Sequence, residues 1–323
     1  MWKRIGCPTN GMMSGDIAIL ELPKELKEKA STELNEWEHQ RDEAIAQLRA
    51  LIQSENLHGC LSDGFLLRFL RARKFDLNNA LHSYRLYYET RTLYPDIFSN
   101  LRPYCVQHVF TECVVARLPS SNDAGCPVLY FQPGRWDPDS WPHTDLFRAN
   151  ILMVEELLLR CPATQVHGVV ILVDLTDLAW RHGVHMIGPS FIRRAARFIQ
   201  GCTPVRVKAI HIYNEPLLFS RIFSALRPLL KEKIRKRIKL HGTSLDSLHS
   251  SIPPHLLPAN CKLKGTGPEI PCTNYMQSLM ELDDYFTRMN HFPIIRRPSA
   301  NVSRVFRSSS NVCQLPQSSS VQK

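Results

Sequence analysis

Beyond about residue 105, short runs of β-branched and aromatic residues alternate with longer stretches of helical periodicity. Strands that alternate with helices in this way build a mostly parallel sheet joined by crossover helices. The best strand candidates are residues 113–118, 128–131, 169–173 and 209–213. We therefore predict an α/β fold in which residues 105–265 form the larger, sheet-containing domain.

Two helices expected between these strands differ in their apolar pattern. Residues 146–159 are apolar almost all round, which is typical of a buried helix. Residues 189–200 are amphipathic, with Phe191, Ile192, Ala195 and Ile199 on one face. We expect that face to point inward and the arginines of this helix to face solvent.

The region before this domain has only helical patterns. Residues 24–52 are helix formers with one apolar stripe, and Ser62, Asp63 and Asp76 offer N-caps for two further helices. We therefore predict a small helical domain over residues 21–100, after a flexible N-terminus of residues 1–20.

The end of the chain changes composition. A C-terminal extension is expected over residues 266–291, and residues 292–323 form a basic, serine-rich tail without acidic residues that is predicted to be disordered. Ser299 follows two arginines and resembles a basophilic kinase site, although a serine-rich tail contains such triplets by chance.

Charge is distributed unevenly along this chain of net charge +10. No carboxylate occurs between Asp177 and Glu215, a gap that contains six cations, and a second basic run over residues 231–239 is relieved only by Glu232. Such a surface suits an anionic membrane, an acidic protein or nucleic acid. Nucleic acid is the least favoured of these, because no aromatic stacking platform or known binding module accompanies the charge.

The distribution of cysteines and the hydropathy of the chain indicate the cellular compartment in which the protein is expected. The ten cysteines are scattered without a CxxC pair or the spacing of a zinc site, so we expect reduced, structural thiols. No apolar run is long enough to span a bilayer, and the opening residues lack the apolar core of a secretory signal. A cytoplasmic protein is expected.

Catalytic motifs are absent from the sequence. GxGxxG, GxxxxGK[ST] and GxSxG do not occur, so neither a phosphate cradle nor a nucleophile elbow is indicated. His182 and His185 lack an HExxH context, and Asp174 and Asp177 lack a partner base, so structural roles are favoured for all four. We expect no enzymatic activity, no metal and no cofactor.

The most informative stretch is residues 202–242. A strand with Arg206 and Lys208 on one face is followed by a segment with one apolar stripe, and then by a basic helix expected to begin at Pro228. The stripe consists of Phe219, Ile222, Phe223 and Leu226. It fits either core packing on the sheet or a lid over an apolar cavity, and the basic helix fits either a solvated face or a binding surface.

Several consecutive sequence blocks resemble the CRAL-TRIO family, and within it the tocopherol-transfer and clavesin branches. These blocks are DGFLLRFLRARKFDLNNAL at residues 63–81, WDP at 136–138, VILVDL at 170–175, and IHIYNEP at 210–216 followed by RPLLKEKIRKRIKLHG at 227–242. The resemblance implies a CRAL-TRIO-N helical domain, then a lipid-binding domain whose sheet floors a pocket closed by a mobile lid helix.

The resemblance also implies roles for individual residues. The apolar stripe, Phe219, Ile222, Phe223 and Leu226, would form the lid. The residues that match the family's phosphoinositide-binding cations are Arg206, Lys208, Lys233 and Arg237. The implied lipid pocket is lined by Phe147, Asn150, Val154, Val169, Ile171, Val173, Ile187, Phe191, Ile199 and Ile210.

Two departures from the family pattern affect these expectations. Asn150 and Val154 stand where the tocopherol pocket has small polar serines, which leaves the ligand open. The family ending LPxEYGG is replaced by residues 257–263, LPANCKL, so the last turn of the domain is expected to differ.

The combined prediction is a non-enzymatic lipid-transfer protein. It would enclose a small hydrophobic ligand that is tocopherol-, retinoid- or phospholipid-like, and dock peripherally on endosomal or other phosphoinositide-rich membranes. The alternative is a phosphoinositide-binding trafficking adaptor of the clavesin type.

Overall fold

The computed structural model describes residues 17–201 and 203–290. Its N-terminal part consists of helices α1 (Lys24–Leu34), α2 (Glu38–Ser54), α3 (Asp63–Ala72) and α4 (Leu77–Leu93). The helical stretch predicted over residues 24–52 is interrupted because Asn35 adopts a left-handed conformation with φ of 60° and ends α1. The N-cap predicted at Asp76 is present, since its side chain accepts a hydrogen bond from the backbone N–H of Asn79.

A five-stranded sheet forms the centre of the molecule. Its strands are β1 (Val115–Ser121), β2 (Pro127–Phe131), β3 (Val169–Asp174), β4 (Val207–Tyr213) and β5 (Ile238–Leu240). They lie side by side in sequence order, with β1 antiparallel to β2 and the other pairs parallel. The predicted α/β fold with a mostly parallel sheet is confirmed.

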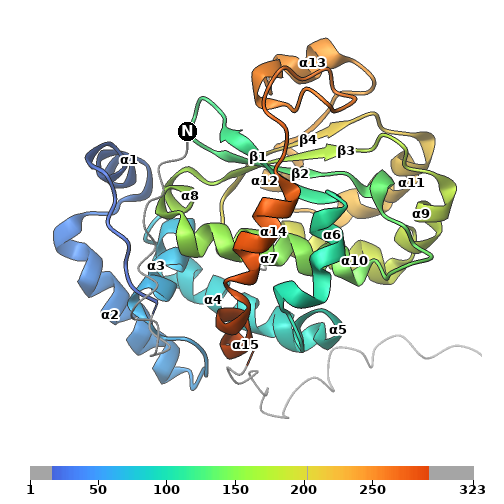
Figure 1. Ribbon diagram of the computed structural model, residues 1–323. Coiled ribbons are helices and arrows are strands. Elements are labelled where there is room, and N and C mark those ends of the chain that lie inside the picture. The colour runs from blue at the N-terminus through green and yellow to red at the C-terminus, as the bar shows by residue number, and fades with distance from the viewer. Residues whose placement is uncertain (1–16, 202, 291–323) are drawn as a thin grey trace, which may run out of the picture.

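The remaining helices cover the sheet and connect its strands. They are α5 (Pro95–Phe98), α6 (Gln107–Thr111), α7 (Thr144–Arg160), α8 (Pro162–His167), α9 (Trp180–Met186), α10 (Pro189–Ile199), α11 (Leu217–Leu226), α12 (Glu232–Arg235), α13 (Leu245–His249), α14 (Cys272–Met280) and α15 (Asp283–Met289). Helices α7 and α10 lie against one face of the sheet, and α13 lies beyond the other (Figure 1).

The two faces of the sheet have different neighbours because side chains alternate along each strand. Tyr130 and Leu172 point toward the α13 side, where they pack with the buried Leu256 and Leu257. Neighbouring positions such as Ile171 and Ile210 point the other way, into the layer bounded by α7, α10 and α11.

The last turn of the sheet domain uses glycines that lie beyond the altered family ending. Gly267 donates its N–H to Leu257 O at 2.8 Å, and Gly267 forms a β-bridge with Pro258. A Cβ on Gly265 would stand 2.2 Å from Leu257 O. The backbone therefore passes close to Leu257 and Pro258 at Gly265 and Gly267, where a side chain would not fit.

The prediction of a basic helix that begins at Pro228 is wrong. Pro228 lies in a single 3₁₀ turn, Arg227–Leu229, which is followed by the four-residue helix α12 and then by β5. The alternating residues Ile238 and Leu240 pair with β4, and this strand pairing outweighs the helical propensity of the lysines and arginines around them.

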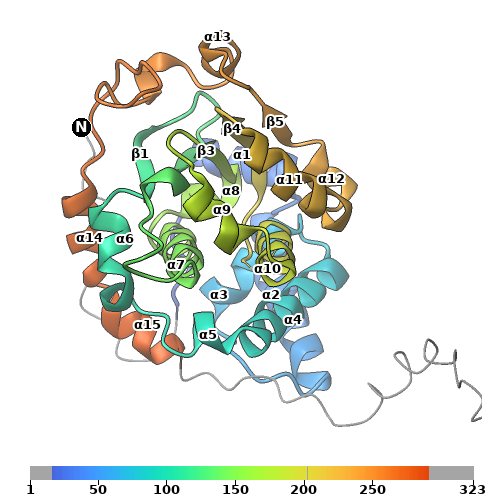
Figure 2. The ribbon, with the colours of Figure 1, turned by 90° about the vertical axis from the view of Figure 1, so that its right-hand side faces the viewer.

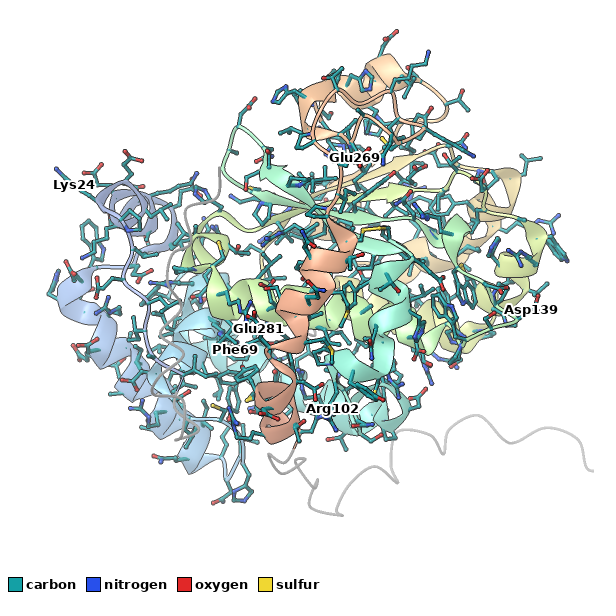
Figure 3. The ribbon with its side chains drawn as sticks, in the orientation of Figure 1. Lys24, Phe69, Arg102, Asp139, Glu269 and Glu281 are labelled. Carbon is teal, nitrogen blue, oxygen red and sulfur yellow. A yellow bond between two sulfur atoms is a disulfide. The ribbon has the colours of Figure 1, made fainter. Side chains whose placement is uncertain are left out.

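The prediction that all cysteines are reduced is wrong for one pair. Cys113, just after α6, forms a disulfide with Cys272, the first residue of α14. The two are 159 residues apart, and spacing in a sequence does not reveal such connectivity. The segment of α14 and α15 is further held by ion pairs of Arg102 with Asp283 and of Arg160 with Glu281. Arg102 and Glu281 are labelled in Figure 3.

A hydrogen bond from Arg71 and two ion pairs of α10 join the helical region to the sheet domain. Arg71 of α3 donates two hydrogen bonds to Glu36, at 2.8 and 2.6 Å, and a third to Gln165 of α8 at 2.9 Å. On α10, Arg194 pairs with Asp96 and Arg197 with Glu89 of α4. The arginines of α10 therefore dock this helix on the N-terminal helices, and only Arg193 among them is exposed as predicted.

Two buried histidines predict a pH dependence of stability. His211 Nδ1 and His241 Nε2 share a hydrogen bond of 2.9 Å, and burial and His241 lower the pKa of His211 to about 4. In the unfolded chain the pKa of a histidine is near 6.5, so the fold favours the neutral form of His211. The contribution of His211 to stability is therefore complete above pH 6.5 and is lost as the pH falls toward 4.

We expect the free energy of unfolding to drop by about 2 kcal/mol between pH 7 and pH 5 through His211. Urea unfolding at the two pH values measures this loss. The variant His211→Asn should reduce the difference, whereas His255→Asn, at an exposed histidine, should preserve it.

Candidate functional site

An apolar cavity of about 280 Å³ lies between the sheet and helices α7, α10 and α11. Strands β2, β3 and β4 form its floor through residues such as Leu129, Ile171 and Ile210, which occupy one face of the sheet. Phe147 of α7 packs against Phe191 and Phe198 of α10, with ring centroids 5.4 and 4.9 Å apart. The cavity is therefore walled by aromatic and branched side chains.

Nearly all the pocket residues implied by the sequence line this cavity. They are Phe147, Asn150, Val154, Val169, Ile171, Val173, Phe191, Ile199 and Ile210. Ile187 is the exception, and its prediction as a pocket residue is wrong. It follows the last residue of α9, is 39% exposed and lies outside the cavity lining.

Helix α11 covers one side of the cavity with the predicted apolar stripe. Phe219, Ile222, Phe223 and Leu226 all line the cavity, and the rings of Phe219 and Phe223 stack 5.6 Å apart. Helices α9, α10 and α11 lie together on the side that faces the viewer in Figure 2. The stripe thus contacts the cavity as a lid would, and its mobility stays a prediction.

The predicted cations gather where strands β4 and β5 begin. Arg206 donates to the backbone carbonyl of Val166, and Arg237 donates to that of Val207. Lys208 pairs with Glu33 of α1 at 3.4 Å. These contacts hold the charged ends of the three side chains at one edge of the sheet.

Lys233 shows that the cations are close enough to repel one another. Burial lowers the pKa of its ammonium group, and the positive charges of Arg237, Arg73, Lys74 and Arg206 lower it further. We call Arg73, Lys74, Arg206, Lys208, Lys233 and Arg237 the basic cluster. An anion bound there would offset this repulsion.

Arg73 and Lys74 were missed by the sequence predictions. They lie in the turn between α3 and α4, more than 130 residues before the other cations in the chain. Lys74 is exposed and has a φ of 57°, a left-handed conformation that forms part of this tight turn. They belong to the sequence RARKF at residues 71–75, but nothing in the sequence indicated that this turn lies near Lys233.

The residues considered for catalysis have structural partners. Asp174 accepts hydrogen bonds from Tyr130 and Thr176, and Asp177 pairs with Lys262 at 2.6 Å. His182 is buried and interacts with the backbone of Ala179. Within the part of the chain that the structure describes, no group of three His, Cys, Asp or Glu side chains could hold a metal ion.

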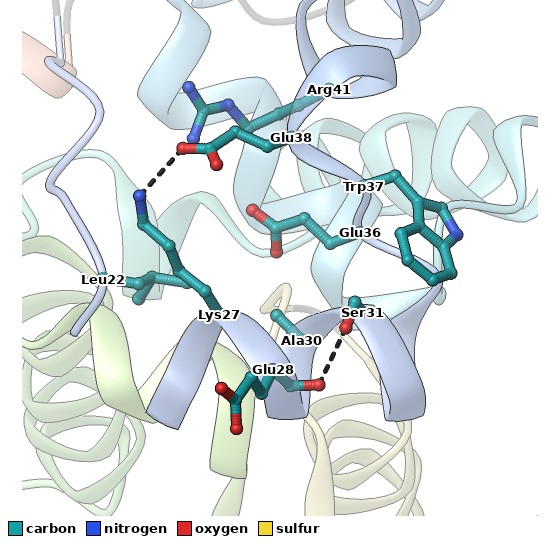
Figure 4. Close-up of a pocket in the computed structure, with 9 residues that line it drawn as sticks. All are labelled: Leu22, Lys27, Glu28, Ala30, Ser31, Glu36, Trp37, Glu38 and Arg41. Carbon is teal, nitrogen blue, oxygen red and sulfur yellow. Dashed lines mark hydrogen bonds and ion pairs between the residues drawn. The ribbon is translucent and has the colours of Figure 1, made fainter. Parts of the chain in front are cut away.

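A second depression, of about 240 Å³, lies at the corner of α1 and α2 (Figure 4). It is open and charged: Lys27 pairs with Glu38 at 2.8 Å across it, and Trp37 is 48% exposed at its rim. Five charged residues line this depression, whereas none of the described residues that line the internal cavity is charged, so the internal cavity is the better candidate for binding an apolar ligand.

Comparisons with known proteins place the chain in a family. The profile described as "CRAL/TRIO domain" matches residues 112–262, and "CRAL/TRIO, N-terminal domain" matches residues 24–84. "Alpha-tocopherol transfer protein-like" of Homo sapiens is 36% identical over 272 residues, covering 84% of this chain and 78% of that protein. The chain belongs to the CRAL/TRIO family. The cavity and helix α11 lie in the CRAL/TRIO domain, and Arg73 and Lys74 lie in the N-terminal domain.

Other CRAL/TRIO relatives have clavesin names. "Clavesin-1" of Pongo abelii is 30% identical over 305 residues, covering 90% of this chain and 85% of that protein. "Clavesin-2" of Homo sapiens is 33% identical over 242 residues, covering 74% of this chain and 73% of that protein. The predicted family is confirmed, and membership supports a lipid-binding role.

Proposed function

We propose that this protein is a non-enzymatic lipid-transfer protein that carries one small hydrophobic ligand between membranes. The observation that carries the proposal is the internal cavity, which is lined by apolar side chains and covered by the apolar stripe of α11. Such a cavity removes the apolar surface of a lipid from water, which is energetically favourable. The name of the tocopherol-transfer relatives supports the same role.

The energetics suit a carrier. A ligand of about 20 to 30 heavy atoms gains roughly 0.3 kcal/mol per atom, or about 6 to 9 kcal/mol in total. This corresponds to a dissociation constant from tens of micromolar to below one micromolar. Binding of this strength holds the lipid in transit and still permits its release.

We further propose that the basic cluster binds phosphoinositide headgroups when the protein docks. Exposed apolar residues near the lid could enter the bilayer at the same time: Trp180 is 61% exposed, Val184 51% and Leu217 90%. No helix in the described residues is both long and apolar enough to cross a membrane. We accordingly propose a cytoplasmic carrier that associates peripherally with endosomal or other phosphoinositide-rich membranes.

The carrier role is tested by identifying lipids that copurify with the protein from eukaryotic cells and by following their transfer between vesicles. A single apolar species bound one to one, and moved from donor to acceptor vesicles, is expected. Protein that copurifies without lipid and transfers none contradicts the proposal.

Docking is tested with Lys233→Ala combined with Arg237→Ala. Each cation near an anionic surface contributes about 1 kcal/mol, so the double variant should bind vesicles containing phosphatidylinositol bisphosphate about 30-fold more weakly. Lipid occupancy should be unchanged, because neither residue lines the cavity. Flotation with vesicles measures the binding.

The matched control removes two cations of the same segment that lie outside the cluster, Arg235→Ala with Lys236→Ala. Both residues are exposed, and Lys236 already pairs with Glu232 at 2.7 Å. Equal losses in the two double variants would indicate attraction by net charge alone and would refute a headgroup site in the cluster.

The alternative function is a phosphoinositide-binding trafficking adaptor, favoured by the clavesin relatives. In that case the cavity lipid would be a structural filler or a sensor. Vesicle binding without transfer of the copurified lipid distinguishes the adaptor from the carrier.

A further inference from the structure

The basic cluster is contacted by an anion of the protein itself, the carboxylate of Glu33 in α1. Its Oε2 atom lies 3.4 Å from Nζ of Lys208 and 4.0 Å from Nη1 of Arg206. Among the residues that the structure describes, Glu33 is the only carboxylate that forms an ion pair with the cluster. Two of the cations that we propose for phosphoinositide headgroups therefore already have a negatively charged partner.

Arg206 links this ion pair to the rest of the cluster. Burial lowers the pKa of its guanidinium group, the carboxylate of Glu33 opposes this effect, and the positive charge of Arg237 adds to it. Burial also lowers the pKa of Lys233, and the charge of Arg206 is among those that lower it further. A negatively charged headgroup that reaches Arg206 and Lys233 therefore approaches the carboxylate of Glu33, and the two like charges repel each other.

The geometry of this ion pair allows it to open. The side chains of Glu33 and Lys208 are 39% and 36% exposed, and ion pairs this close to solvent contribute little to stability. The other carboxylate oxygen of Glu33, Oε1, lies 3.5 Å from Lys29, one turn earlier in α1, so Glu33 keeps a partner when it leaves Lys208. Helix α1 is also held by its buried Leu34, which belongs to one apolar cluster with Val166 of α8. Only the carboxylate has to move.

From these contacts we infer that Glu33 is an intramolecular competitor of the headgroup, whose carboxylate leaves Lys208 and Arg206 when a phosphate of a phosphoinositide takes its place. This inference rests on the proposed docking function, since it names how that site is regulated. A phosphate group carries more negative charge than a carboxylate and can replace it at the two cations. Glu33 thereby raises the charge that a headgroup needs in order to bind, which disfavours weakly charged lipids.

The experiment measures, by flotation, how tightly the full-length protein binds phosphatidylcholine vesicles that contain phosphatidylinositol bisphosphate. Glu33→Gln keeps the shape of the side chain and removes its charge, and it should bind about fivefold more tightly than the wild type. The matched control is Glu28→Gln, which removes the same charge from the same helix at an exposed residue that lines the depression of Figure 4. It should change the binding by less than about twofold, because salt screens exposed charges that lie apart.

A double-mutant cycle with Lys208→Ala tests whether the competition acts through this ion pair. In the Lys208→Ala background, Glu33→Gln should strengthen binding by less than about twofold, because the cation for which Glu33 competes is gone. A gain that persists undiminished there, or that Glu28→Gln reproduces, indicates attraction by net charge and overturns the inference, as does unchanged binding of Glu33→Gln. If neither the wild type nor Glu33→Gln binds these vesicles, the proposed docking function fails and the inference fails with it.

Discussion

A cavity-filled variant, Val154→Trp combined with Ala195→Trp, is expected to bind lipid about a hundredfold more weakly than the wild type. Both residues line the cavity, from α7 and α10 respectively, so two indole rings would occupy much of its 280 Å³. A ligand that loses about half of its contacts forfeits about 3 kcal/mol of the 6 kcal/mol estimated for 20 heavy atoms. This loss corresponds to about two decades in the dissociation constant.

The measurement is the molar ratio of copurified lipid to protein, read together with the melting temperature. Ala46→Trp is the matched control, because it makes the same change at an exposed position of α2. That control should retain its lipid. Full occupancy in the cavity-filled variant would show that the lipid is held elsewhere, whereas a lowered melting temperature with lost lipid would call for the smaller change Ala195→Phe.

The sequence predicted the cavity well because periodicity determines which side chains share a face. In β3, alternation put Ile171 and Val173 on the same side as the cavity, and in α11 the helical spacing put Phe219 and Ile222 on one stripe. The family resemblance then indicated which face of the sheet lines the cavity. Local spacing is enough for such assignments, because a strand or helix fixes the direction of each side chain.

Contacts between distant segments could not be predicted in this way. Arg73 and Lys74 join the basic cluster only because the fold brings their charges near Lys233, and Cys113 contacts Cys272 only because α14 packs against α6. The prediction that Ile187 lines the pocket disagrees with the structure for a different reason. It stands directly after the last residue of the short helix α9, where helical spacing no longer determines which face a side chain occupies, and it is 39% exposed.

Arg71→Leu is expected to lower the free energy of unfolding by about 3 to 5 kcal/mol. The side chains of Arg71 and Glu36 are 2% and 6% exposed, and the variant would leave the Glu36 carboxylate buried without its partner. Removing one partner of a buried ion pair costs this much because an uncompensated charge remains in the interior. Chemical denaturation of wild type and variant measures the difference.

The double variant Arg71→Leu with Glu36→Leu separates the cost of the unpaired charge from the cost of lost contacts. If the charge dominates, the double variant should regain most of the stability, since replacing a buried pair by apolar residues is often close to neutral. Lys236→Leu, at an exposed pair, should cost only about 0.5 kcal/mol. A double variant as unstable as Arg71→Leu would instead assign the cost to the hydrogen bond from Arg71 to Gln165, which ties α3 to α8 and so joins the helical region to the sheet domain.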